Sequence, residues 1–327
     1  MRDSEKAILH ILTTLPFYKG GEDSTLIIGA DNFLSCEARI YSPYSPLDTK
    51  SIQPHASEWQ GAFKNILVIG TKQKQETAYF LALALKCAAQ DACVIVALEN
   101  NWGGKSLDKL FNEAFLTAHT ASKHKSRVVW TVLPQDIAPE ITHKWLEEGG
   151  LHQRPDGQWT QAGIFSWEKM DRGTSVFMKY FEAPLKGDGA DFGCGCGDLS
   201  KFILENNQGV STLHLLDIDS RAVTCAARNL NAYKEKINPI CCNITQDPLP
   251  KNLDFIVMNP PFHTGKDQQI TLGQAFITQA VKSLKAGGIV GVVANVHLPY
   301  EELLRENFRT VKTIAIEDGF KVMTAQK

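Results

Sequence analysis

The sequence lacks the long apolar run, the metal-binding cysteine spacing and the strong charge that mark several common classes of protein. No apolar run approaches the roughly 18 residues of a membrane span, so we expect no membrane segment. The eight cysteines include Cys-Gly-Cys and Cys-Cys but no C-x-x-C pair, so we expect free thiols in a reducing cytoplasm and no bound metal. The formal net charge of −2 provides no overall positive field for nucleic acid, although a local basic patch would still allow binding.

The composition that remains is that of a soluble globular protein with two domains. Of the 327 residues, 43% are hydrophobic and 21% are charged, and a chain of this length usually forms about two domains. Residues 1–17 predict an amphipathic helix rather than a secretion signal, because Glu5 and Lys6 precede a short apolar stretch. The stretch 147–174 is rich in glycine and polar residues, so we predict domains over 1–150 and 151–327.

Strand and helix patterns alternate regularly along the C-terminal half. Such alternation predicts a mostly parallel sheet covered by helices on both faces, with the last two strands close enough for an antiparallel hairpin. The predicted strands are 189–193, 211–217, 239–243, 254–259, 289–295, 312–318 and 320–325. The predicted helices are 198–207, 220–234, 274–288 and 299–308, the first two capped by Asp198 and Ser220. We therefore predict an α/β, Rossmann-like domain with a seven-stranded sheet.

The N-terminal half repeats this alternation more faintly. Residues 65–70 and 93–100 predict strands, and 74–90 predict the helix between them. Setting 65–100 beside 190–219 places a strand, a glycine turn, a helix, a strand and an acid in both halves. This suggests two tandem Rossmann-like domains that arose by duplication.

In this alignment the N-terminal copy lacks a ligand-binding turn. The turn 69–75 contains one glycine together with Lys72 and Lys74, so no G-x-G would admit a ligand. We predict that residues 1–150 form a degenerate, non-catalytic domain with an RNA-binding or structural role. The two lysines and the basic run 123–127 would contact phosphates or form a solvated face.

A glycine-rich loop follows the first strand of the C-terminal domain. In "DFGCGCGDLS" the glycines Gly193, Gly195 and Gly197 permit a tight turn and close approach of a ligand to the backbone. Asp217 follows Gly197 by 20 residues and ends the next predicted strand, where a carboxylate binds the two hydroxyls of a ribose. The loop therefore predicts a nucleoside-containing cofactor.

The acid before this loop distinguishes between two such cofactors. The glycine spacing departs from the dinucleotide pattern G-x-G-x-x-G, and Asp191 lies two residues before Gly193. A carboxylate there would repel a pyrophosphate but would suit the amino-acid end of S-adenosylmethionine. We therefore favour S-adenosylmethionine over a dinucleotide.

The motif "NPPF" ends another buried strand. The side-chain carbonyl of Asn259 and the backbone carbonyl of Pro260 are both acceptors, while Pro260 and Pro261 have no backbone N–H. Two acceptors can hold both hydrogens of an amine, and Phe262 offers a face on which a base can stack. This arrangement predicts methylation of an exocyclic or amide nitrogen, where alignment matters more than a strong base.

Four stretches together resemble the bacterial ribosomal RNA guanine-N2 methyltransferases that modify small-subunit RNA. These stretches are "DFGCGCGDLS", "LLDID", "FIVMNPPFH" and "VANVHLPYEELLRENF" with the later "FKVMTA". "GIFSWEKMDRGTSVF" resembles the segment that leads into the family's catalytic domain, and the match spans about 163–325. The N-terminal half resembles the family's degenerate duplicate domain in outline.

The resemblance implies S-adenosylmethionine as methyl donor and the N2 amine of a guanine in 16S rRNA as acceptor. It implies a monomer in the cytoplasm that acts on rRNA, a ribosomal subunit or an assembly intermediate, with no metal. It assigns to the cofactor site Asp191, Gly193, Gly195, Gly197, Asp217, Asn243, Gly173 and Thr174. It assigns to the catalytic loop Asn259, Pro260, Pro261 and Phe262.

Three other interpretations stay open at this point. A sister family with the same two-domain plan modifies large-subunit rRNA. Enzymes that methylate protein glutamine also use Asn-Pro-Pro, but they usually continue with Tyr and carry a small helical N-terminal domain. A non-catalytic RNA-binding protein with a vestigial site would be expected to have lost part of the glycine loop, Asp217 or "NPPF", all of which are intact.

Overall fold

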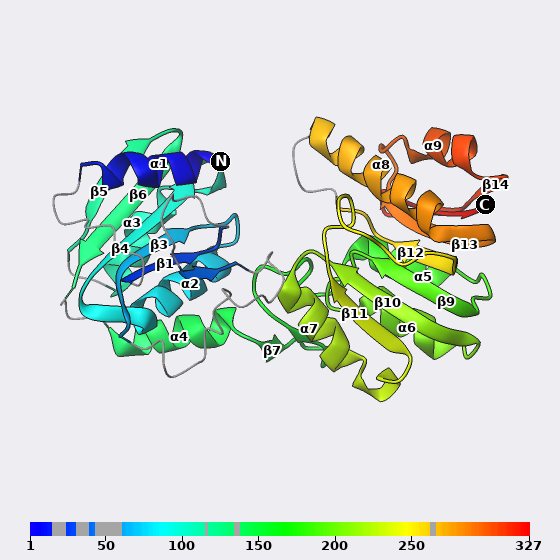
Figure 1. Cartoon of the computed structure of the whole chain (residues 1–327), viewed down its shortest axis with the longest axis horizontal. Coiled ribbons are helices and arrows are strands. Elements are labelled where there is room, and N and C mark those ends of the chain that lie inside the picture. The colour runs from blue at the N-terminus through cyan, green and yellow to red at the C-terminus, as the bar shows by residue number, and fades with distance from the viewer. Residues whose placement is uncertain (15–23, 31–38, 43–60, 115–116, 134–137, 262–265) are drawn as a thin grey trace. The chain divides into compact units, whose positions relative to one another are not determined.

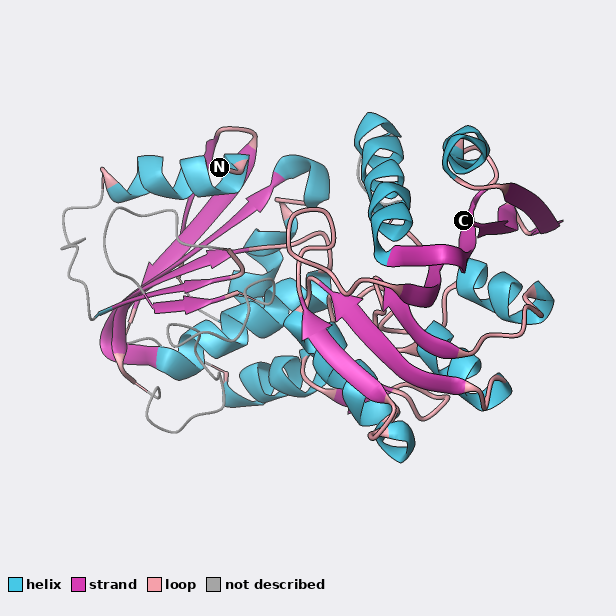
Figure 2. Ribbon diagram, turned by 45° about the vertical axis from the view of Figure 1, so that its right-hand side comes forward, coloured by secondary structure: helices cyan, strands magenta, loops and turns pink. Residues whose placement is uncertain are grey.

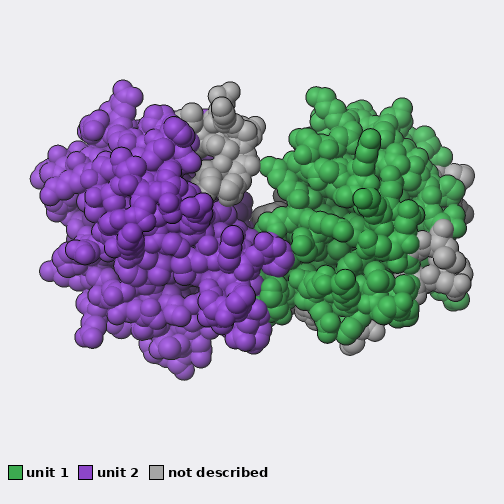
Figure 3. Space-filling view, turned by 180° about the vertical axis from the view of Figure 1, so that it is seen from behind, with its two compact units in different colours: residues 1–152, 161–163 green, residues 153–160, 164–327 purple. Residues whose placement is uncertain are grey.

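The structure is a computed structural model that describes residues 1–14, 24–30, 39–42, 61–114, 117–133, 138–261 and 266–327. It divides into two compact units, which Figure 3 colours separately. The N-terminal unit comprises residues 1–152 and 161–163, and the C-terminal unit comprises residues 153–160 and 164–327. Among the helices in the described ranges, none is both long and apolar enough to cross a membrane.

Seven strands of the C-terminal unit form one sheet in the order β11-β10-β9-β12-β13-β15-β14 (Figure 1). Neighbours from β11 to β13 are parallel, whereas β15 runs antiparallel to both β13 and β14. This confirms the predicted seven-stranded, mostly parallel sheet with a C-terminal antiparallel hairpin. The strands are β9 (Gly187–Phe192), β10 (Val210–Asp217), β11 (Ile237–Cys241), β12 (Leu253–Met258), β13 (Leu284–Asn295), β14 (Thr310–Glu317) and β15 (Phe320–Gln326).

Helices cover both faces of this sheet (Figure 2). On β12, Phe255 and Val257 belong to the core beneath α5, α6 and α7, while Ile256 and Met258 belong to the core beneath α8 and α9. Because successive side chains of a strand point to opposite faces, a strand that is apolar throughout must be buried on both. The helices are α5 (Arg172–Tyr180), α6 (Asp198–Asn206), α7 (Ser220–Asn229), α8 (Lys266–Ser283), α9 (Tyr300–Asn307) and the 3₁₀ turn η4 (Asn231–Tyr233).

Two helix starts differ from the prediction by one residue. The N-caps are Gly197 and Asp219, not Asp198 and Ser220. Gly197 adopts a left-handed conformation with φ of +89°, which glycine accommodates without strain. Asp198 becomes the first helical residue, and its two carboxylate oxygens accept hydrogen bonds of 3.0 and 2.6 Å from the buried Arg154. The Asp198 carboxylate, predicted to cap the helix, is therefore paired with the buried Arg154, a contact that the local sequence does not predict.

The N-terminal unit contains a second mixed sheet, in the order β2-β1-β3-β4-β6-β5 for its described strands. The neighbours from β2 to β4 are parallel, and β6 is antiparallel to β4 and β5. Helix α1 packs on one face, and α2, α3 and α4 pack on the other. The strands are β1 (Thr25–Ile28), β2 (Arg39–Tyr41), β3 (Phe63–Ile69), β4 (Ala88–Glu99), β5 (His119–Lys123) and β6 (Ser126–Val132). The helices are α1 (Asp3–Leu12), α2 (Lys74–Cys87), α3 (Ser106–Ala114), α4 (Pro139–Gly149) and the 3₁₀ turn η3 (Asn100–Trp102). A separate two-stranded sheet, β7 (His152–Gln153) with β8 (Trp159–Thr160), follows later in the chain.

Six strands of the C-terminal sheet have counterparts of the same order and direction among the described strands of the N-terminal sheet, but our alignment of the two halves is wrong. Strand order and direction match β1, β2, β3, β4, β6 and β5 to β9, β10, β12, β13, β15 and β14. Residues 65–100 therefore correspond to β12, α8 and β13, not to 190–219. The turn 69–75 lies where "NPPF" begins in the other unit, and the counterpart of the glycine loop follows β1 and continues into 31–38, outside the described residues. Periodicity could not distinguish these alternatives, because every strand–helix–strand unit shows the same pattern.

A cavity at the switch point of the C-terminal sheet

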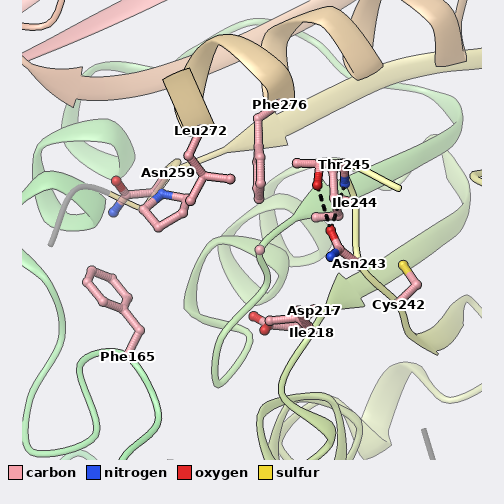
Figure 4. Close-up of a pocket in the computed structure, with 12 residues that line it drawn as sticks. Phe165, Asp217, Ile218, Cys242, Asn243, Ile244, Thr245, Asn259, Leu272 and Phe276 are labelled. Atoms are coloured by element: carbon pink, nitrogen blue, oxygen red, sulfur yellow. Dashed lines mark hydrogen bonds between the residues drawn. The ribbon is translucent and has the colours of Figure 1, made fainter. Parts of the chain in front are cut away.

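The chain of the C-terminal unit reverses its direction of travel across the sheet between β9 and β12. Strands β10 and β11 follow β9 to one side, and β12 and β13 follow to the other, so a crevice opens at the carboxyl ends of β9 and β12. A cavity of about 280 Å³ lies there (Figure 4), and a smaller one of about 20 Å³ shares Phe165 and Gly193 with it. The larger cavity is lined by, among others, Asp217, Ile218, Asn243, Ile244, Asn259, Pro261, Leu272 and Phe276. The smaller cavity is lined by, among others, Asp171, Thr174, Asp191 and Gly195.

The glycine loop between β9 and α6 requires all three of its glycines. Gly193, Gly195 and Gly197 have φ angles of +78°, +52° and +89°, a region that favours glycine. A Cβ on Gly195 would meet no atom within 4 Å, and one on Gly193 would meet Phe276 at 3.5 Å, so both positions border open space. A Cβ on Gly197 would lie 3.2 Å from Ala226 of α7, and Gly197 lines neither cavity. The first two glycines border the cavities, whereas the third allows the loop to pack against a helix.

Asp217 ends β10 and faces the larger cavity. Its carboxylate accepts hydrogen bonds of 3.0 Å each from the backbone N–H groups of Gly195 and Asp219. Burial raises the pKa of Asp217 to about 6. A carboxylate has about four acceptor positions, so these backbone bonds leave capacity for a ligand hydroxyl.

Asp191 is fully buried on β9, beside the smaller cavity. Its Oδ2 accepts a hydrogen bond of 2.6 Å from the hydroxyl of Ser200, while its Oδ1 has no hydrogen-bond partner among the described residues. Burial, and then the nearby charge of Asp217, raises the pKa of Asp191 to about 7. A buried acceptor without a partner destabilises a fold by about 1–3 kcal/mol, and a cationic ligand would supply the missing donor.

Asn259 follows β12 and is 8% exposed. Its amide nitrogen donates to Asp171 Oδ2 at 2.8 Å and to Thr174 Oγ1 at 3.1 Å. Its Oδ1 is buried and has no hydrogen-bond partner in the described part of the chain. The site thus holds two unpaired acceptors, one on β9 and one after β12, on either side of the switch point.

Of four further predicted site residues, two line neither cavity, one lines the larger cavity and one lies outside the described residues. Pro260 is buried and Gly173 lies outside the lining of both cavities, where a Cβ on Gly173 would approach the ring of Phe320 to 2.8 Å. Asn243 lines the larger cavity, and its Oδ1 accepts from the backbone N–H and the hydroxyl of Thr245 at 3.0 and 2.8 Å. Phe262 falls outside the described residues, and its role stays a prediction.

The site residues that sequence reasoning missed include two polar residues and several apolar ones. Asp171 and Ser200 hold Asn259 and Asp191 through their side chains. The others are apolar walls, which Figure 4 shows around the larger cavity: Phe165, Leu272 and Phe276. The spacing Asp-x-x-Thr is a helix-capping signal that would have identified Asp171 as an N-cap, although not as a partner of Asn259.

Comparison with known proteins assigns the chain to a family. Residues 158–324 match the Methyltransferase small domain, and residues 32–148 match the Methyltransferase small domain N-terminal family. The Ribosomal RNA small subunit methyltransferase C of Shewanella piezotolerans is 31% identical over 291 residues, which cover 86% of this chain and 83% of the relative. The chain belongs to the ribosomal RNA small subunit methyltransferase C family. The relative from Psychromonas ingrahamii is 28% identical over 304 residues, which cover 91% of this chain and 86% of that protein.

A solved structure shares the fold along nearly the whole chain. The T. thermophilus 16S rRNA N2 G1207 methyltransferase (RsmC), in complex with AdoMet and guanosine, superposes with a TM-score of 0.73 at 17% identity. The match covers 98% of this chain and 92% of the other. Together with family membership, this confirms the predicted family, the fold class and the assignment to the methyltransferases.

The donors and acceptors of the site fit the cofactor expected of a methyltransferase C family member. Asp217 would bind the ribose hydroxyls and Asp191 the ammonium group of S-adenosylmethionine, which would supply the donor that Asp191 Oδ1 lacks. Ile218, Ile244 and Phe276 form apolar walls suited to the adenine ring. Two carboxylates beside the loop would repel a pyrophosphate, so the site suits S-adenosylmethionine better than a dinucleotide.

Proposed function

We propose that this chain methylates the exocyclic N2 amine of a guanine in 16S ribosomal RNA, with S-adenosylmethionine as methyl donor. The observation that carries this proposal is that Asn259 lines the larger cavity and that its buried Oδ1 has no hydrogen-bond partner among the described residues. The acceptor class follows the names of the relatives and of the T. thermophilus enzyme, which acts on guanine N2. Both cavities are built within one unit of a single chain, which supports a monomer as the catalytic form.

The loop after β12 would orient a weak nucleophile for reaction. The lone pair of a guanine N2 amine is delocalised into the ring, so the nitrogen is a poor nucleophile. Asn259 Oδ1 and the Pro260 carbonyl would accept both amine hydrogens, which favours a pyramidal nitrogen with its lone pair directed toward the cofactor. S-adenosylmethionine supplies a methyl group activated by a positively charged sulfur. As the N–C bond formed, the bond between the methyl group and sulfur would break and S-adenosylhomocysteine would leave. The nitrogen would then lose one proton to water, so no strong base is required.

The guanine must leave any helix to reach this cavity. A base inside a duplex cannot reach a pocket at a strand end, so the target is unpaired or flipped out of its stack. Phe165 is 37% exposed at the cavity and Phe262 is predicted nearby, which provides aromatic surface for stacking on a flipped base. We propose an assembly intermediate or free RNA as substrate, because the base is then accessible.

Labelled-methyl transfer tests this function. We expect incorporation into 16S rRNA, either free or in an assembly intermediate of the small subunit, and N2-methylguanosine as the labelled nucleoside in mass spectrometry. Large-subunit rRNA and a protein with a glutamine-containing loop serve as alternative acceptors in the same assay. Label in either of them, with none in 16S rRNA, would reject the proposed acceptor and identify the correct one.

We further propose that the N-terminal unit contacts RNA phosphates through the edge of its sheet where β3 and β4 end. Lys72 Nζ lies 5.5 Å from the ring centroid of Trp102 in η3, and the backbone N–H of Asn100 donates to the Lys125 carbonyl at 2.8 Å. These contacts bring the turn after β3 and the β5–β6 turn to one place, where Lys72, Lys105 and Lys125 are exposed. The charge and the neighbouring indole ring suit a phosphate backbone with adjacent bases.

Charge reversal at this edge should weaken RNA binding. We expect Lys72→Glu with Lys125→Glu to lower RNA affinity at least about tenfold and to reduce the log–log salt slope by about one unit per lysine. The matched control reverses Lys64 and Lys144, two exposed lysines elsewhere in the unit, and should leave binding unchanged. Equal losses in both double variants, measured by filter binding over a salt series, would contradict a specific contact surface.

A further inference from the structure

Asp171 connects the start of α5 to the end of β12. Its Oδ2 accepts the backbone N–H of Thr174 at 2.9 Å, which caps the helix, and also accepts the Asn259 amide nitrogen at 2.8 Å. Thr174 Oγ1 receives a second hydrogen bond from the same amide nitrogen at 3.1 Å. Two residues of one helix turn therefore engage the amide group of a residue 85 to 88 positions later in the chain.

This arrangement allows one orientation of the amide. An ionised carboxylate has no hydrogen to donate, so the NH₂ side of Asn259 must face Asp171. The Oδ1 side then points away and stays unpaired and buried in the described part of the chain. If the amide turned over, Oδ1 would face the carboxylate, and the NH₂ group would face the substrate amine, donor against donor.

We propose that Asp171 and Thr174 are positioning residues that hold Asn259 with its acceptor oxygen directed at the substrate. This inference rests on the proposed function, since it assigns the orientation of the atom that grips the amine. The orientation also contributes to substrate choice. A fixed hydrogen-bond acceptor at this point favours methylation of an atom that carries hydrogens, such as an amine nitrogen. It disfavours a carbonyl oxygen or a ring nitrogen without hydrogen.

Asp171→Asn separates positioning from helix capping. Asparagine caps helices about as well as aspartate, so the start of α5 should be preserved. Its amide can present either a donor or an acceptor, so the Asn259 amide is no longer restricted to one orientation. We expect kcat to fall about 10- to 100-fold, as for a misaligned reacting group. The KM for RNA and the melting temperature should remain those of the wild type, and the affinity for S-adenosylhomocysteine should fall much less than kcat, although Asp171 lines the smaller cavity.

Variants at the neighbouring positions give the matched comparison. Thr174→Val removes the hydroxyl at nearly constant volume and should lower kcat by a smaller factor, which Thr174→Ser should restore. Ser175→Ala removes a hydroxyl from the same helix turn that bonds to the Asp171 backbone carbonyl and not to Asn259. We expect Ser175→Ala to leave kcat unchanged.

The hydrogen bonds that the Asn259 amide donates to Asp171 and Thr174, here called the clamp, can be tested by NMR without any turnover. In the unliganded ¹⁵N-labelled protein, the side-chain NH₂ signals of Asn259 are those missing from Asn259→Ala. We expect slow hydrogen exchange of these protons in the wild type and in Ser175→Ala, and fast exchange in Asp171→Asn.

Three results would overturn the inference. The first is wild-type kcat in Asp171→Asn, and the second is a loss of S-adenosylhomocysteine affinity as large as the loss of kcat, which would assign Asp171 to the cofactor. The third is exchange of the Asn259 amide that is equally fast in the wild type and Asp171→Asn. If the wild type failed to methylate guanine N2, the proposed function would fail, while amide exchange would still decide whether the clamp exists.

Discussion

Asn259→Ala should lower methyl transfer to RNA by about 10²- to 10³-fold, the size found when one preorganised hydrogen-bonding group is removed from an active site. The variant loses the acceptor that would hold the amine, but it retains Asp191 and Asp217, the carboxylates assigned to the cofactor. Single-turnover kinetics at saturating RNA should therefore show the loss in rate. Calorimetry should show S-adenosylhomocysteine binding within about twofold of the wild type.

Asn295→Ala provides the matched control for this experiment. Asn295 also ends a strand of the same sheet, where its Oδ1 accepts from the backbone N–H of His297 at 3.1 Å, and it lines neither cavity. Its removal should leave turnover near that of the wild type. A comparable loss of rate in both variants would indicate damage to the sheet edge, and a parallel loss of cofactor affinity in Asn259→Ala would place Asn259 in the cofactor site instead.

Cofactor affinity should fall steeply as the pH is lowered from 8 to 5. The pKa values of about 7 for Asp191 and about 6 for Asp217 mean that both carboxylates gain protons within this range. A protonated Asp191 no longer attracts an ammonium group, and each pH unit below a pKa reduces the ionised fraction about tenfold. At pH 5 the two groups together should weaken S-adenosylhomocysteine binding up to about 10³-fold, which titration calorimetry across the pH range would measure.

One control variant makes the pH profile interpretable. In Asp191→Asn, affinity should be weak throughout and should begin to fall near pH 6 instead of near pH 7, since Asp217 is then the group that titrates. A profile that is flat from pH 8 to 5 in the wild type would show that neither carboxylate contacts the cofactor as a charged group.

Unfolding would not account for the loss of affinity. The pKa values of both aspartates are raised in the folded chain, so it binds more protons than the unfolded chain between about pH 4 and 7. Their contribution to the free energy of unfolding therefore decreases as the pH rises through this window. The unliganded protein should lose no stability through these two groups as affinity falls toward pH 5, which thermal melting would verify.

Local conformational and chemical requirements explain why the glycine loop, the carboxylates at the strand ends and the proline turn could be predicted from the sequence. Gly193 and Gly195 are needed because their φ angles are positive, and prolines end β12 because they lack an N–H for the sheet. Asp191 and Asp217 lie on successive parallel strands, so the rule that ligands bind at carboxyl strand ends places them together. Gly197 obeys the same backbone requirement but serves packing, because contact with Ala226 depends on a helix whose position the loop does not specify.

The pattern of hydrophobic and polar residues could not predict which elements of the two halves correspond. The stretch 65–100 has the same succession of elements as 190–219, yet the order and direction of the strands pair it with β12, α8 and β13. Strand order arises from long-range hydrogen bonds between backbones, which leave no trace in the order of residue types. The turn containing Lys72 is therefore the counterpart of the "NPPF" loop, not of the glycine loop.

The sequence by itself determined the family, the seven-stranded sheet and the cofactor class, because each depends on residues whose conformation or chemistry acts locally. Tertiary structure decided how the Asn in "NPPF" is oriented. Its amide is held by Asp171, 88 residues earlier, and by Thr174 on the same helix turn. These hydrogen bonds join the start of α5 to the residue that follows β12. They depend on how the chain folds, and no spacing rule within α5 or β12 predicts them.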